Sequence, residues 1–198
     1  VVFARSFCNA GPLRKPTRGR NESDEAFRIK NWSHFESMGG DFLVEQHVAG
    51  LDAVRWAIDQ APVVAHGQGG WVEASEQGEV FDHHLLQFEF DRGAVLVSQC
   101  RRIAKGWNHT GETIHGTAGV ADLATGKIHD HQGNLILEAG RPYSSKAATA
   151  NQQADFFRSI RFGQAENQVN EAAESNLLAL LGQQASKTAK RARFDRLV

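Results

Sequence analysis

One segment of the chain, from Gly39 to Ile58, carries two carboxylates whose spacing could do chemistry. At the roughly 100° per residue of an α-helix, Glu45 and Asp52 fall on one stripe, with Ala49 between them and Trp56 beyond. That stripe borders an apolar stripe expected to face a sheet, made of Val44, Val48, Leu51 and Ile58. Carboxylates beside a buried stripe can transfer protons or bind substrate hydroxyls. A polar shoulder facing solvent fits the same spacing equally well.

Three further residues could contribute to a binding site. His47 lies in the same segment, but helical spacing places it on the opposite flank of the apolar stripe from Glu45. Trp107 and Asn108 lie in the sequence KGWNHTGE, between two predicted strands. An aromatic ring next to an amide suits a sugar-like ligand, because the ring packs against the sugar and the amide bonds its hydroxyls. An ordinary packed loop has the same composition.

The sequence gives little support for a dinucleotide-binding turn, a metal site or a disulfide framework. Gly67-Gln68-Gly69-Gly70 follows a predicted strand, but Val72 occupies the third glycine position of a G-x-G-x-x-G turn and no helical pattern follows. We therefore expect a hairpin turn there and not a dinucleotide site. The histidines lack the three or four converging ligands of a structural metal site, so no metal is expected. Cys8 and Cys100 are too few for a disulfide framework and are interpreted as reduced thiols.

The elements that must position these residues are mostly short strands. Strand patterns are expected at residues 1–8, 63–67, 83–91, 94–102, 112–115, 120–123 and 135–137. We expect a hairpin turn at Asp91-Arg92-Gly93, an exposed loop at 11–30, and helices at 39–60, 147–162 and 171–190. Because helices do not alternate with strands, the pattern predicts an α+β fold: a large, mostly antiparallel, open-faced sheet with helices packed on one face.

Composition limits the partners. A net charge of −1 leaves no basic excess for binding phosphates, which excludes nucleic acid as the main partner. No run of about 18 apolar residues predicts a membrane span, and no signal peptide is visible, so we expect a cytoplasmic protein. The chain opens inside a strand pattern at Val1, which indicates that an upstream part is missing.

The order of these motifs resembles the C-terminal domain of the glucose-fructose oxidoreductase / inositol dehydrogenase (Gfo/Idh/MocA) family. Gly39-Gly40 matches the family's glycine run, Glu45 takes its first acidic position, and Asp52 matches its last Asp. The sequence HGTAG at His115–Gly119 is similar to a glycine-bearing turn of the family sheet, and Asn170–Ala185 is similar to its late helix. The resemblance covers nearly the whole chain.

This resemblance implies that residues 1–198 form a substrate-binding and oligomerisation domain, and that the N-terminal dinucleotide-binding domain lies outside this chain. The parent would be a dehydrogenase of a sugar, polyol or related hydroxy compound. Its NAD or NADP would be bound mainly by the missing domain and not by this fragment, which would be inactive alone. Glu45 would be catalytic. The residues expected to contact substrate are His47, Ala49, Asp52, Trp107 and Asn108.

Ala49 is the main departure from the family pattern, because the family's usual histidine falls on it. An alanine has no proton to give or take. Either His47 substitutes from a displaced helix start, or the chemistry does not use this histidine, or the protein is inactive by the usual route. The alternative function is therefore a non-catalytic ligand-binding or oligomerisation domain on the same fold.

The two faces of the sheet are expected to differ. The apolar side chains of Leu86, Phe88 and Phe90 are assigned to one face, and a polar set to the other, namely His84, Gln87 and Glu89. Helices on one face leave the second face to be buried by another subunit. We therefore expect a symmetric homo-oligomer formed through the sheet.

Overall fold

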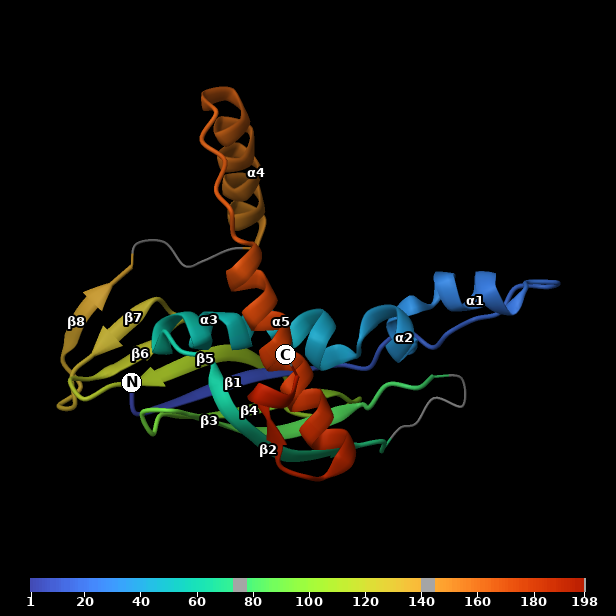
Figure 1. The fold of residues 1–198 in the computed structure, drawn as a ribbon, viewed down its shortest axis with the longest axis horizontal. Helices are drawn as coiled ribbons and strands as arrows, with labels where there is room; N and C mark the ends of the chain where they lie inside the picture. The colour runs from blue at the N-terminus through green and yellow to red at the C-terminus, as the bar shows by residue number, and fades with distance from the viewer. Residues whose placement is uncertain (73–77, 140–144, 198) are drawn as a thin grey trace.

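The computed structural model describes residues 1–72, 78–139 and 145–197, which form one sheet with helices on one side (Figure 1). The strands are β1 (Phe3–Ala10), β2 (Pro62–Gly70), β3 (His83–Phe90), β4 (Val95–Arg102), β5 (His109–His115), β6 (Val120–Asp122), β7 (Lys127–His129), β8 (Leu135–Glu138) and β9 (Ala192–Arg193). Their order across the sheet is β8-β7-β6-β5-β1-β4-β3-β2-β9. Neighbouring strands pair antiparallel except β1 and β4, which are parallel. The predicted α+β fold with a mostly antiparallel sheet is confirmed.

The α-helices are α1 (Asp24–Lys30), α2 (Glu36–Gly39), α3 (Val48–Ile58), α4 (Ser145–Phe162) and α5 (Val169–Thr188). A π-helical turn at Leu43–His47 leads into α3, and 3-10 turns occupy Trp32–His34 and Phe194–Arg196. The last two α-helices confirm the closing helices predicted from the sequence. In the described ranges, no helix is long and apolar enough to cross a membrane.

The hairpin of β3 and β4 is the clearest local success of sequence reasoning. Its turn lies at the predicted Asp91-Arg92-Gly93, where Gly93 has a φ of 81°, a left-handed conformation that favours glycine. Leu86 and Phe88 are fully buried and Phe90 nearly so, and the apolar face predicted for β3 is therefore part of the core. These side chains pack against α3 and α5, so the two helices cover the sheet face that carries Leu86, Phe88 and Phe90.

A glycine in α5 lets this helix approach the sheet closely. A Cβ atom at Gly182 would lie 2.8 Å from both Leu86 Cδ1 and Phe88 Cζ. We expect Gly182→Val to lower the free energy of unfolding by about 1–3 kcal/mol, the usual cost of overpacking a core. Denaturant unfolding measures this loss. Gly11→Ala, where an added Cβ meets nothing within 4 Å, is the control, and an equal loss in both variants would contradict the close packing.

The chain before α3 differs from the sequence prediction in two places. Residues 24–30 of the predicted loop form α1, which Ser23 caps by accepting a hydrogen bond from the Ala26 amide at 3.2 Å. The predicted helix at 39–60 is interrupted near its start. α2 ends at Gly39, Gly40 reverses the chain at a φ of 84°, and the π-turn precedes α3.

Two predictions on β2 and β3 were wrong. Gly67–Gly70 is not a hairpin turn but the end of strand β2, paired with β3. His84 does not belong to the polar face, because it is 1% exposed on the helix-covered side. Residues two apart on a strand share a face, so His84 lies with Leu86 and Phe88.

Candidate functional site

The π-turn that carries Glu45 is held in place by a buried carboxylate. Asp41 is 2% exposed and accepts hydrogen bonds from the amides of Leu43 and Val44, at 2.8 and 3.3 Å. It thereby satisfies two of the backbone donors that the start of a helix leaves free. Arg102, at the end of β4, donates a hydrogen bond to Gln46 in the same turn.

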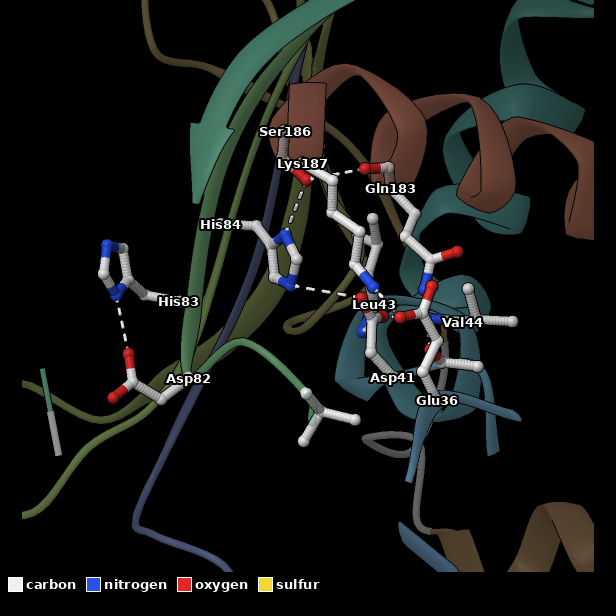
Figure 2. A network of polar contacts seen from close by, with 12 residues as sticks. Glu36, Asp41, Leu43, Val44, Asp82, His83, His84, Gln183, Ser186 and Lys187 are labelled. Atoms are coloured by element: carbon white, nitrogen blue, oxygen red, sulfur yellow. Dashed lines mark hydrogen bonds and ion pairs between the residues drawn. The ribbon is translucent and has the colours of Figure 1, made fainter. Parts of the chain in front are cut away.

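A buried polar network ties this turn to β3 and α5 (Figure 2). His84 Nδ1 lies 2.9 Å from the Ser186 hydroxyl, and His84 Nε2 lies 3.5 Å from Asp41 Oδ2. Burial lowers the pKa of the His84 imidazole, while the Asp41 carboxylate opposes that fall. Gln183 also donates to the Gly40 carbonyl at 2.6 Å. The start of the helix is therefore anchored from two elements that are distant in sequence.

Beneath α3, a carboxylate on β5 faces the helix. Glu112 accepts a hydrogen bond from the Ser6 hydroxyl on β1 at 3.1 Å. Gly50 of α3 lies directly over this pair, and an added Cβ would collide with the Glu112 carboxylate and approach Ser6 Oγ to 2.7 Å. Burial raises the pKa of Glu112, although the Ser6 hydrogen bond opposes the rise. Such a carboxyl can hold a proton closer to neutral pH than an exposed one.

Cys8 lies close enough to Glu112 and Glu45 for both carboxylates to influence its pKa. It lies one step further along β1, on the same face as Ser6, and its pKa is raised by burial. The charges of Glu112 and Glu45 add to that rise, while Arg102 opposes it. We call the set Cys8, Glu45, Arg102 and Glu112 the polar cluster. In the part of the chain that the structure describes, no group of His, Cys, Asp or Glu could hold a metal ion.

The predicted site residues on the helix have different surroundings. Glu45, a member of the polar cluster, is half-buried, and Ala49 is exposed about one turn further on. Asp52 instead accepts a hydrogen bond from Ser175 of α5 and lies 3.8 Å from Arg55. The two carboxylates of the predicted stripe therefore have separate partners.

His47 does not reach the surface. It is 1% exposed, and its Nε2 lies 2.7 Å from the Ser98 hydroxyl on β4. Burial lowers its pKa to about 3, so the ring is neutral at ordinary pH. In this structure His47 is a core residue that packs against β4.

Trp107 and Asn108 lie across the sheet from Glu45. The Trp107 ring stacks on His109 with centroids 4.8 Å apart and meets Phe7 edge-on at 5.7 Å. Phe7 alternates with Ser6 and Cys8 along β1, so it lies on the face opposite the polar cluster. The structure does not bring these two residues into one site with Glu45.

Sequence reasoning missed Glu112, Cys8 and Arg102. These residues come together because strands that are far apart in the chain pair with each other. Ser6 lies opposite Glu112, and Cys8 lies opposite Thr110. A pairing of β1 with β5 would have placed both residues on the face of the core residue Ala4.

Comparisons with known proteins identify the fold. No family model matches the sequence, and no curated protein matches it. Solved structures match the chain over nearly its whole length. Myo-inositol 2-dehydrogenase from Lactobacillus plantarum is 18% identical over 98% of this chain and 56% of its own, with a TM-score of 0.67. An oxidoreductase from Agrobacterium radiobacter, in complex with NAD+, L-tartaric acid and magnesium, is 13% identical over 100% and 58%, with a TM-score of 0.70. The chain has the fold of the C-terminal domain of Gfo/Idh/MocA oxidoreductases.

A third solved structure shares this fold. Aldose-aldose oxidoreductase from Caulobacter crescentus, complexed with glycerol, is 14% identical over 97% of this chain and 55% of its own, with a TM-score of 0.67. The chain thus spans little more than half the length of the solved chains that it matches.

Proposed function

We propose that this chain is the substrate-side domain of an NAD- or NADP-dependent oxidoreductase that acts on a sugar, polyol or related hydroxy compound. The observation that carries the proposal is the position of Glu45 in the turn before α3, which the buried Asp41 holds in place, on the fold of the C-terminal domain of Gfo/Idh/MocA oxidoreductases. The sequence resemblance, which places Glu45 at the family's first acidic position, supports the same function.

The dinucleotide would be held mainly by a second, upstream domain of the same polypeptide. The described part of this chain offers no glycine turn between a strand and a helix start, since Gly67–Gly70 continues β2. The nicotinamide would supply the hydride acceptor. The chain's own contribution would be to orient the substrate hydroxyl through Glu45. Glu112, whose pKa is raised, would hold a proton near it.

A non-catalytic binding or oligomerisation domain is the second candidate, and Ala49 favours it. Assembly through the sheet is compatible with both candidates. The face away from α3 and α5 mixes half-buried apolar side chains with polar ones, among them Phe3, Phe7, Val95 and Val97. A second copy covering that face would bury them, and we propose a homo-oligomer formed in this way.

The proposed function is tested by the reduction of NAD and NADP by the full polypeptide with a panel of sugars and polyols. We expect turnover with at least one of them, and we expect Glu45→Gln to lower kcat/KM by about 10-fold to 10²-fold. That range corresponds to one charge-assisted hydrogen bond worth about 1.5–3 kcal/mol. Glu25→Gln, at an exposed position of α1, should leave the rate unchanged. Substrate binding without any turnover would favour the second candidate.

A further inference from the structure

Helix α4 stands away from the rest of the domain. It projects from the beginning of α5, beyond the helix-covered side of the sheet (Figure 1). From Lys146 to Phe162, every described side chain is exposed except two that are half-buried, and α5 buries its first residue only at Ser175. No part of the described domain therefore covers α4.

The second half of α4 exposes three large apolar side chains that lie close together on the helix. Phe156, Phe157 and Ile160 are 59%, 64% and 64% exposed. At about 100° per residue these three side chains share an arc of about 100°, and we call them the apolar face of α4. Asp155 and Arg158 form an ion pair on the other side of the helix.

Such a helix needs a partner. Helices in proteins owe most of their stability to the packing of an apolar face, and the described domain provides no such packing for α4. Large aromatic side chains that gather on an exposed surface mark a site of interaction.

We infer that the apolar face of α4 docks against the dinucleotide-binding domain of the same polypeptide, an inference that rests on the proposed function. Glu45 and α3 lie on the helix-covered side of the sheet, and hydride transfer requires the cofactor to reach that side. α4 projects on this same side (Figure 1). The matching solved chains are long enough to hold another domain, since this chain covers only 54–58% of them. A second copy bound through the open sheet would lie on the opposite side.

The docking is tested by hydrogen exchange of the full polypeptide, comparing wild type with the double variant Phe156→Ala/Ile160→Ala. Alanine is the strongest helix former, so these changes favour the helix itself and remove only the apolar contacts. We expect the amides of α4 to exchange at least about tenfold faster in the variant. Asn151→Ala, on the other side of the helix, should not speed exchange, because it keeps the apolar contacts and also favours the helix.

The remaining outcomes separate this inference from the proposed function. If the variant exchanges no faster than wild type, α4 is not docked and the inference is wrong, while sugar- or polyol-dependent reduction of NAD leaves the function standing. If the protection of α4 disappears on dilution to the monomer, the occupant is a second copy and the inference is also wrong. A full polypeptide without a dinucleotide-binding domain would overturn both.

Discussion

In the full polypeptide, Ala49→His should raise the rate of nicotinamide reduction by about 10²–10⁴-fold, the usual contribution of a positioned acid or base. Residue 49 follows Glu45 by about one helical turn, and its side chain is exposed, so an imidazole has room there. The Glu45 carboxylate could then accept a hydrogen bond from the ring and orient it towards a substrate hydroxyl. Single-turnover kinetics with the substrates of the panel measure the gain.

Two controls make this result specific. Trp56→His introduces an imidazole at a position that is 77% exposed on the same helix, and it should produce no gain. Adding Glu45→Gln to Ala49→His should remove most of the gain, because the carboxylate no longer orients the ring. A gain that survives the loss of Glu45, or no gain at all, would show that the base is supplied elsewhere.

The second large effect is on stability at acidic pH. The pKa of His47 in the folded protein is about 3, well below the value of about 6.5 expected in the unfolded chain. As pH falls below about 6.5, the unfolded state takes up a proton that the folded state does not. The contribution of His47 is therefore complete above pH 6.5 and is lost as pH falls towards 3, by up to about 1.4 kcal/mol per pH unit.

This pH dependence is measured by denaturant unfolding at several values between pH 7.5 and 4. His47→Gln keeps a hydrogen-bonding side chain near Ser98 but does not titrate, so its stability should fall less steeply with decreasing pH. His131→Gln, at an exposed position, should retain the wild-type slope. Equal slopes in wild type and His47→Gln would mean that other groups, such as buried His84, account for acid unfolding.

The sequence predicted those parts of the fold that depend on neighbours in the chain. The β3–β4 hairpin follows from alternation around Gly93, and the closing helices follow from patterns within single segments. The π-turn could not be predicted, because the helical stripes assume about 100° per residue throughout. His84 was misplaced because its partners Asp41 and Ser186 come from other elements.

The candidate site also combines residues that one segment of sequence reveals with residues that only the strand pairing brings together. Glu45 and Ala49 could be found because they belong to one helical segment. Glu112 could not, since its contact with Ser6 joins residues 106 apart in the sequence. The separation of Trp107 from Glu45 likewise depends on which face of β1 carries Phe7, and strand alternation decides this only once the pairing is known.

The place of β1 in the sheet has a consequence for how the chain folds. β2, β3 and β4 pair with one another in sequence, and so do β5 to β8. In the described sheet these two ribbons are joined by β1, whose Phe3 lies opposite Val95 on one side and His115 on the other. β1, which precedes the other strands of this sheet in the sequence, must therefore wait for partners encoded about ninety to a hundred and ten residues later, a long-range closure that slows folding. Until then, the edges of β4 and β5 remain open to other strands, so the newly made chain is most exposed to mispairing at the centre of its future sheet.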